Sequence, residues 1–305
     1  MANTMEFAKV FETNLDKLAV QTLKTGFMDS NAVQLKYTGG SEIKVPKMTV
    51  QGLGDYSRTN GYVSGSVNLQ YETLTMTQDR GRKFTIDAMD VDETNFVATA
   101  GNMMSEFQRT QIVPEIDAYR ISKLATIAMA GSNVEYGYTI AKDTIIQKIK
   151  LGIKAIREAG YDEEIDVLLS YDAMSAIEEA ALGRLNAVTF SQGGIDTTVP
   201  QIDGCPLITV PSNRLYTAIT LYDGETSGQE AGGYIKASSA KNINFLIVAR
   251  NTPIAVTKQD KMRIFTPDTY QKANAWSIDY RRYHDIWVLD NKKNSIFVNI
   301  KEANA

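Results

Sequence analysis

A long helical pattern constrains the fold of this chain more than any other sequence feature. From Asp90 to about Ala130, apolar side chains recur at intervals of three and four, which predicts one helix with a buried face. A helix of about 38 residues extends roughly 57 Å at ~1.5 Å per residue, whereas the mean globular helix has about 11–12 residues. A helix of this length indicates a spine with other parts of the molecule on both sides.

The ends and the middle of this segment carry further signals. Asp90 and Glu93 have the spacing of a capping box at the start. Gly131 follows the last apolar position, where a left-handed cap is expected. Pro114 lies inside the segment and predicts a kink or a split into two helices, because proline cannot donate the helical hydrogen bond.

Composition narrows the class of protein. The chain has 305 residues, 43% hydrophobic and 22% charged, which is ordinary for a globular protein with two modest domains. The net charge of −4 gives no basic footprint for gripping nucleic acid. No apolar run approaches the roughly 18 residues of a membrane span. The one cysteine, Cys205, excludes an internal disulfide and fits a reducing compartment.

The N-terminal segment reads as an arm followed by a strand. Residues 3–25 have helical spacing, and we expect a short helix or two and then an extended arm. Gly39-Gly40 is a predicted flexible joint. Glu42–Val50 reads as a strand in which Pro46 suits an edge or irregular position.

The next segment, Gln51–Ile86, predicts a long two-stranded ribbon. Its first part is rich in glycine and polar residues, its second part alternates, and Asn60-Gly61 is a hairpin turn dipeptide. A lone hairpin is marginally stable in water, so this ribbon needs a neighbouring surface.

Residues of about 140–260 predict an α/β domain. Asp143–Gly160 is an amphipathic helix, and Tyr171–Leu182 is a second helix. Four short apolar runs read as strands and two polar segments as loops. The strands are Ile165–Ser170, Pro206–Val210, Tyr216–Tyr222 and Ile243–Ala249, and the loops are Asn186–Asp203 and Asp223–Gly233.

The C-terminal segment returns to both regions. Trp276–Leu289 predicts a long strand beside the long helix. After a turn at 291–294, Ser295–Ile300 predicts a last strand in the α/β sheet. The fold class is therefore α+β, with a chain that passes repeatedly between two domains.

The search for catalytic chemistry gives no credible active site, cofactor site or metal site. No phosphate-binding glycine motif is present. The single histidine, His284, excludes a multi-histidine metal site, and its place on a predicted strand favours a packed structural role. Cys205 reads as a small buried residue. The acidic run 87–93 lacks the pattern of a calcium loop, and helix capping explains it better.

A basic cluster at Arg80, Arg82 and Lys83 has two interpretations. It has the charge to bind phosphate, but acidic residues lie close in the sequence. Ion pairing at a protein interface is therefore the favoured interpretation. The acids are Glu72, Asp79 and Asp87.

The order of arm, ribbon, long helix, α/β domain and returning strand resembles the tailed-phage major capsid proteins of the HK97-like fold. Asp79–Ala125 is similar to the ribbon base and spine helix of this family in phages and prophages of Gram-positive bacteria. Asp279–Val298 is similar to the C-terminal strands of the same group. The resemblance covers nearly the whole chain.

The resemblance implies a division of the chain into named parts. They are an N-terminal arm (1–40), an extended β-hairpin loop (41–87), a peripheral domain with the spine helix (88–139 and 261–290) and an axial domain (140–260 and 291–305).

The resemblance also implies a non-enzymatic role. Copies of the chain are expected to form pentamers and hexamers of an icosahedral shell that encloses double-stranded DNA without sequence-specific binding. A portal protein and a separate scaffolding protein are the expected partners, the virion capsid is the expected location, and assembly would occur in the host cytoplasm without a membrane. The ribbon is expected to contact a neighbouring subunit through Tyr56, Arg58, Tyr62, Leu69, Tyr71, Arg80 and Arg82.

Two departures from the family pattern carry expectations. Some members cross-link covalently through a lysine on the extended loop, but no lysine lies between Lys47 and Lys83, so we expect no cross-link. Some begin with a helical scaffolding segment, but this chain reaches its ribbon by about residue 50, which leaves no room for one.

Two alternatives remain open at this stage. An encapsulin-like bacterial nanocompartment has the same fold and differs in its gene neighbours. A hydrolase or transferase with an α/β core would need polar residues converging on His284 or Cys205 and would exist as a monomer or small oligomer.

Overall fold

The structure is a computed structural model that describes residues 23–34, 42–59, 61–89, 103–181, 185–192 and 195–304. Several expectations fall outside these residues. They are the helical spacing before Leu23, the joint at Gly39-Gly40, the start of the long helix at Asp90 and Asn60 of the turn dipeptide.

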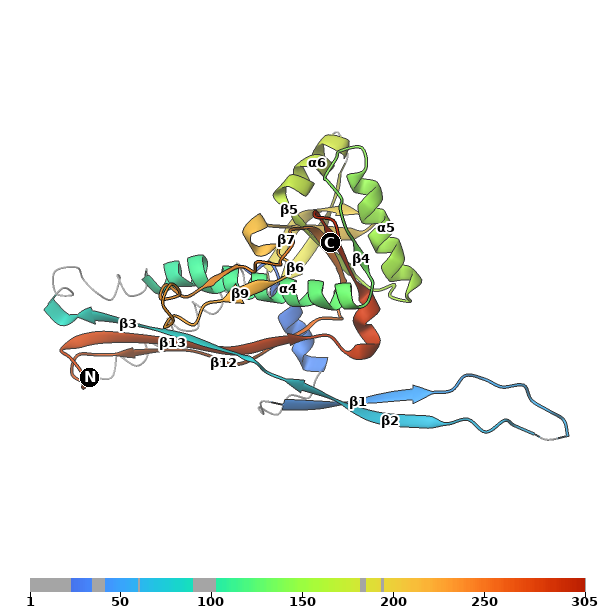
Figure 1. The fold of residues 1–305 in the computed structure, drawn as a ribbon, viewed down its shortest axis with the longest axis horizontal. Helices are drawn as coiled ribbons and strands as arrows, with labels where there is room; N and C mark the ends of the chain where they lie inside the picture. Colours follow the sequence, from blue (N-terminus) through green and yellow to red (C-terminus); the bar gives the residue numbers. More distant parts are fainter. Residues whose placement is uncertain are drawn as a thin grey trace.

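The elements follow one another along the chain as the labels of Figure 1 indicate. The helical segments are η1 (Gly26–Gln34), η2 (Gln108–Ile112), α4 (Val113–Ala130), α5 (Ile145–Glu158), α6 (Tyr171–Ala181), η3 (Ser212–Arg214) and η4 (Asp290–Ser295). The strands are β1 (Glu42–Val50), β2 (Val67–Thr75), β3 (Gln78–Asp87), β4 (Val134–Glu135), β5 (Ile165–Ser170), β6 (Asn186–Gln192), β7 (Ile195–Ile202), β8 (Cys205–Val210), β9 (Ile219–Leu221), β10 (Tyr234–Lys236), β11 (Ile243–Ala249), β12 (Ile254–Phe265), β13 (Ala275–Trp287) and β14 (Ile296–Ile300).

A seven-stranded mixed sheet with the order β4-β14-β11-β5-β8-β7-β6 forms the larger core. Val167 and Leu169 of β5 pack with α5 and α6, whereas Leu168 packs toward α4 on the opposite face. Figure 1 shows the sheet between these two helical layers. Because both faces are covered, the central strands β5 and β11 are buried along their whole length, which explains their continuous apolar sequences.

Helix α5 lies close against this sheet. Its predicted apolar stripe is confirmed: Ile145, Ile149, Ile153 and Ile156 are all buried. Gly152 permits the close approach, because a Cβ atom there would lie 2.6 Å from Ile247 Cδ1.

The spine helix is continuous across the described part of its predicted span. It runs from residue 103 to Ala130, and residues 108–112 form a π-helical segment. The predicted split at Pro114 is wrong, since Ile112 and Val113 keep right-handed helical dihedral angles. The irregularity is instead the π-helical segment directly before the proline, where the missing N–H disturbs the hydrogen-bond ladder.

The cap at the end of the spine helix lies one residue later than predicted. Gly131 has φ −84°, whereas Ser132 has φ 62° and is the left-handed residue. The Asn133 N–H then donates to the Ala128 carbonyl at 3.0 Å and closes the end of the helix.

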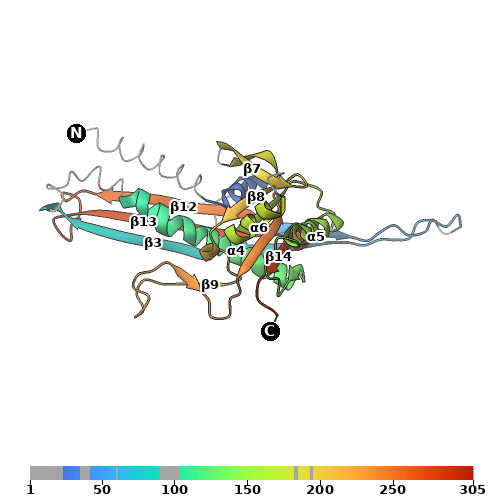
Figure 2. The same ribbon diagram turned by 90° about the horizontal axis from the view of Figure 1, so that it is seen from above.

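A three-stranded antiparallel sheet with the order β12-β13-β3 lies along the spine helix (Figure 2). Ile278 and Tyr280 of β13 pack with Ile116 and Met104 of the helix. The predicted strand beside the long helix is therefore confirmed, and β14 returns to the seven-stranded sheet as predicted.

Three sequence expectations on strands are corrected. β3 pairs with β13, so the return arm of the ribbon ends at Thr75 rather than at Ile86. The predicted loop Asn186–Asp203 is the antiparallel hairpin β6–β7, because pairing with β8 extends the sheet over it. The predicted strand Tyr216–Tyr222 is reduced to the three residues of β9.

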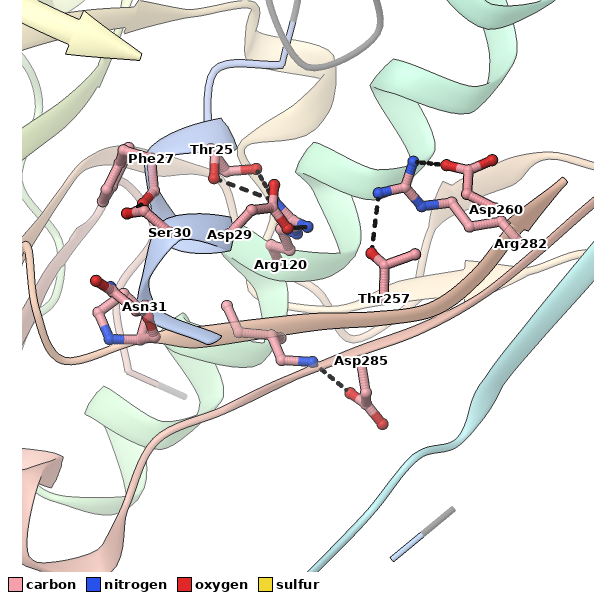
Figure 3. A network of polar contacts seen from close by, with 12 residues as sticks. Thr25, Phe27, Asp29, Ser30, Asn31, Arg120, Thr257, Asp260, Arg282 and Asp285 are labelled. Atoms are coloured by element: carbon pink, nitrogen blue, oxygen red, sulfur yellow. Dashed lines mark hydrogen bonds and ion pairs between the residues drawn. The ribbon is translucent and has the colours of Figure 1, made fainter. Parts of the chain in front are cut away.

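Buried charges attach η1 to the spine helix. The fully buried Arg120 pairs with Asp29 at 2.6 Å and donates to the Thr25 carbonyl (Figure 3). Asp117 accepts hydrogen bonds from the N–H and the hydroxyl of Thr25 and pairs with Arg214 of η3. These contacts keep the buried charges paired, which is the condition under which charges are tolerated in a core.

Candidate assembly interface on the projecting ribbon

The most prominent feature outside the two packed regions is the antiparallel pair β1–β2. We call residues Glu42–Thr75 the ribbon and the rest of the chain the body. The ribbon extends away from the body to one end of the molecule in both views (Figures 1 and 2). Within the described residues β1 and β2 form a sheet of their own, with Glu42 opposite Thr75 and Val50 opposite Val67.

The register divides the ribbon into two faces, because directly opposed residues of antiparallel strands lie on the same side. One side, which we call the apolar face, is formed by three opposed pairs. They are Pro46 with Tyr71, Met48 with Leu69, and Val50 with Val67. All six side chains are exposed; Met48, for example, is 65% exposed.

The opposite side of the ribbon changes character along its length. Near the body it is apolar, and Ile43, Val45 and Leu74 pack with Trp287 in one cluster. Farther out it is polar, with Lys47 opposite Gln70 and Thr49 opposite Asn68. On this side, the apolar residues therefore lie only where the body covers them. The apolar residues of the other side, the apolar face, are not covered by any described part of the chain.

The tip of the ribbon adds aromatic surface. The rings of Tyr56 and Tyr62 lie 4.9 Å apart, and Tyr62 is 90% exposed. The backbones of Ser57 and Gly61 exchange two hydrogen bonds, and Gly61 has φ 77°, which suits glycine. Arg58 is exposed between them. The tip is thus a closed turn that presents side chains outward.

Exposed apolar side chains concentrate on this ribbon. Within the described residues, the large exposed apolar and tyrosine side chains outside it are Met89, Leu151, Tyr171 and Ile235, which lie on separate elements. Monomeric proteins rarely expose a contiguous apolar patch, and such patches mark interaction surfaces. The apolar face and the tip of the ribbon are therefore a candidate interaction surface.

The two arginines predicted to join this contact lie elsewhere. Arg80 and Arg82 belong to β3 in the sheet along the spine helix. The Arg80 guanidinium forms a two-pronged pair with Glu115 and donates to the carbonyls of Tyr222 and Gly233. Arg82 donates to the Glu230 carbonyl.

The structure therefore brings together five of the seven predicted residues on the ribbon: Tyr56, Arg58, Tyr62, Leu69 and Tyr71. The partners of Arg80 and Arg82 in this chain are a spine-helix acid and loop carbonyls rather than the acids that are close in sequence. Asp79, one of those acids, pairs with Arg281 instead.

Sequence reasoning missed four of the six residues of the apolar face. Pro46, Met48 and Val50 lie on β1, which was interpreted as a strand before the ribbon rather than as its first arm. Their spacing of two was the available signal, since alternate residues share one face of a strand. Val67 was also missed.

The residues considered for catalysis are packed side chains. His284 is buried beside the Tyr119 ring, and burial together with the nearby Arg282 lowers its pKa well below the ordinary value. Cys205 is buried, and burial raises the pKa of its thiol. Both observations confirm the structural interpretation of these two residues.

Two other features are absent from the described part of the chain. No group of three or more histidine, cysteine, aspartate or glutamate side chains is placed to hold a metal ion. No helix there is long and apolar enough to cross a membrane.

The fold defines the class: it is the HK97-like fold of phage capsid chains, as the resemblance implied. A chain from Mycobacterium phage Che8 aligns with a TM-score of 0.57 at 12% identity, covering 87% of this chain and 86% of that one. The bacteriophage PhiM1 mature capsid gives a TM-score of 0.56 at 10% identity over 86% of this chain and 82% of that one. The capsid of cyanophage P-SCSP1u gives 0.54 at 10% identity over 87% and 84%. No protein-family model and no curated protein matches the sequence.

Proposed function

We propose that this protein is the major capsid protein of a tailed phage, a non-enzymatic subunit that assembles into a closed shell around double-stranded DNA. The main observation in support is the ribbon. It projects from a fold shared with phage capsid chains, and the described chain does not cover its apolar face. Burial of that face against a second copy would stabilise assembly at about 25 cal/mol per Å² of apolar surface removed from water.

The proposal includes finer parts. The shell is built of pentamers and hexamers, with a portal protein and a separate scaffolding protein as partners, and it forms in the host cytoplasm and becomes part of the virion. The net charge of −4 supports a container that encloses DNA without gripping its phosphates. The parts of the chain act as arm (1–40), extended loop (41–87), peripheral domain (88–139 and 261–290) and axial domain (140–260 and 291–305). Of the extended loop, only the ribbon projects, because β3 belongs to the sheet along the spine helix.

The ribbon supplies the contact between subunits through its tip and its apolar face. Tyr56, Tyr62 and Tyr71 offer large contact area at low entropy cost, and Arg58 contributes register at the tip. Arg80 and Arg82 remain predicted contact residues, but each would have to act from β3 while keeping its partners in this chain. Each contact can be weak, because closure of a shell multiplies it over many subunits.

A face-specific test separates the ribbon's two sides. We expect the double variant Met48→Ser/Leu69→Ser to remain folded and monodisperse but to form no shells. The matched control is Thr49→Ser/Gln70→Ser, which changes the next residue of each strand, on the polar side of the ribbon, and should assemble normally. Sedimentation velocity and electron microscopy of purified protein give the readout.

If the apolar-face variant forms normal shells, the proposed role of the ribbon is refuted. A wild-type protein that stays monomeric under all assembly conditions, with and without co-expressed scaffolding protein, would sink the shell function itself. Shells loaded with a host enzyme and made without portal or terminase genes nearby would identify a nanocompartment instead.

Denaturing gels of purified shells test the absence of cross-links. We expect one band near 33.7 kDa with and without reductant, since no lysine lies between Lys47 and Lys83 and the outer part of the ribbon therefore has none. A ladder of covalent multimers would contradict this expectation.

A further inference from the structure

At its C-terminal end, the ribbon joins the body over three residues, Thr75, Met76 and Thr77, which we call the root. The root lies between the end of β2 and the start of β3. The pairing of β3 with β13 ends at Gln78 opposite His284, so the root is the point where the chain leaves the sheet of the body. A free joint here would let the ribbon adopt many directions.

Three alternate residues at the end of β13 each form a hydrogen bond with one residue of the root. The Tyr283 hydroxyl donates to the Met76 carbonyl at 3.1 Å. The indole N–H of Trp287 donates to the Thr75 carbonyl at 3.3 Å. Between them, Asp285 accepts from both the N–H and the hydroxyl of Thr77, each at 2.9 Å. All three root residues are thereby attached to one strand.

Asp285 is the centre of this arrangement. Its side chain is fully buried, and the root occupies only one of its oxygens, Oδ2. The other, Oδ1, accepts from the Lys123 ammonium at 2.6 Å, from the Tyr119 hydroxyl at 2.8 Å and from the Ile286 N–H. Figure 3 shows the dashed line that ends at Asp285. One carboxylate therefore connects the root, the end of β13 and the spine helix.

A buried carboxylate with this set of donors resists displacement. Its charge is compensated by Lys123 and by hydrogen bonds, and moving Thr77 away would leave a buried acceptor unsatisfied. The same group would be costly to bury merely to support a fold, since apolar residues of similar size often serve a core equally well. Its position at the root suggests that its role is to fix geometry.

We propose that Asp285 is a positioning residue that sets the direction in which the ribbon leaves the body, so that the apolar face is presented to a neighbouring copy before contact. The role of this ribbon direction in assembly rests on the proposed function. The direction itself is a property of a single chain and can be measured without assembly. Ordering the ribbon in advance lowers the entropy lost on association, which is how preorganisation strengthens binding.

The test compares Asp285→Asn with Asp279→Asn, a matched change six residues earlier on the same side of the same strand. The amide of the first variant has a similar size but brings an N–H₂ group toward the surrounding donors. Asp279 accepts from the Ser277 hydroxyl and lies opposite Lys83, away from the root, so its variant controls for the strand. Spin labels on Gln70→Cys of the ribbon and Lys154→Cys of α5, both exposed, report the ribbon direction in a Cys205→Ala background.

We expect a single narrow distance distribution in the dissociated parent protein and in the Asp279→Asn control. In Asp285→Asn we expect a broadened or shifted distribution. The amide of Thr77 should lose about tenfold or more of its hydrogen-exchange protection, because its acceptor is weakened. Amides of β5 and β11 should keep theirs. An unchanged distribution together with unchanged Thr77 protection would overturn the proposal.

Thr77→Val provides the second route if Asp285→Asn loses protection throughout the chain. It removes the hydroxyl contact and leaves the backbone contact, so a smaller broadening supports the proposal and an unchanged distribution overturns it. These measurements on single subunits are independent of assembly. A wild-type protein that forms no shells but shows the expected loss of ribbon order would therefore refute the proposed function and leave the role of Asp285 intact.

Discussion

Two strand pairs of this molecule carry apolar side chains in opposite situations. The pair β5–β11 of the seven-stranded sheet is buried on both faces, with Leu246 and Val248 toward α4 and Phe245 and Ile247 toward α5. The pair β1–β2 of the ribbon has an apolar face that the described chain leaves exposed.

The difference shows what each apolar surface is for. In the sheet, apolar area is removed from water when the single chain folds, so it contributes to the free energy of folding. On the ribbon, the same kind of area stays in water when the single chain folds, and under the proposed function it contributes to association instead. Substitutions in the two regions should therefore separate folding from assembly.

The largest effect is expected on the side of the sheet packed by α5. Replacing Ile153, which is fully buried, by alanine should lower the free energy of unfolding by about 2–5 kcal/mol through lost burial and the cavity left behind. Leu151→Ala on the same helix, at a half-exposed position, should stay within about 0.5 kcal/mol. Denaturant unfolding of dissociated subunits measures both. Equal effects would show that α5 does not derive its stability from the sheet.

A pH effect is expected next, also confined to the sheet. Burial raises the pKa of Asp166 on β5 to about 6, against the opposing influence of Arg250. The folded state then keeps a proton between about pH 4 and 6 that the unfolded state has released, so the contribution of Asp166 to stability falls as pH rises through this window. The loss is at most about 3 kcal/mol.

The measurement is the difference in unfolding free energy between wild type and Asp166→Asn across pH 4 to 7. The wild type should lose stability relative to the variant as pH rises, whereas Asp162→Asn at an exposed position should run parallel to the wild type. A difference that grows in the other direction would show that the Arg250 pair outweighs burial.

A smaller effect tests the close approach of α5 to the sheet. Gly152→Ala would place a Cβ atom against Ile247 and Phe297 and should cost about 1–3 kcal/mol through overpacking. Gly52→Ala on the ribbon meets nothing within 4 Å and should be neutral or slightly stabilising. Thermal unfolding of the two variants side by side tests whether the same substitution separates the regions.

Sequence periodicity was sufficient to predict the elements whose apolar residues are close together in the sequence. The stripe of Ile145, Ile149, Ile153 and Ile156 predicts α5, and the continuous apolar runs predict β5 and β11, because burial acts directly on residues that are close in sequence. The order of these elements also supported the resemblance to the capsid fold.

Pairing between distant segments was not readable in the same way. The sequence of Glu42–Val50 does not indicate that this strand pairs with Val67–Thr75. The polar sequence of β6 and β7 likewise does not indicate the hairpin that they form beside β8. The same limit explains the interface residues. Tyr56, Tyr62, Leu69 and Tyr71 stand out as apolar residues in a polar segment. In contrast, the partners of Arg80 are Glu115 of the spine helix and carbonyls of a loop more than 140 residues away, which no local pattern indicates.

The smallest effect on stability is expected on the ribbon, where it is most informative. Val67→Thr replaces one methyl group of the apolar face by a hydroxyl, at a side chain that is 68% exposed. Unfolding free energy should change by less than about 0.5 kcal/mol, since water solvates the hydroxyl in both states. The same change at the fully buried Val248 of β11 should cost about 1–3 kcal/mol through an unsatisfied hydroxyl.

Assembly should reverse this order. The Val67→Thr subunit should need a higher protein concentration to form particles, measured by light scattering, because its hydroxyl becomes buried only in the contact between copies. The Val248→Thr subunit, at temperatures where it is folded, should assemble at the wild-type concentration. If Val67→Thr assembles normally, the apolar face stays in water within the shell, and the contact must be made by the tip or by the polar side of the ribbon.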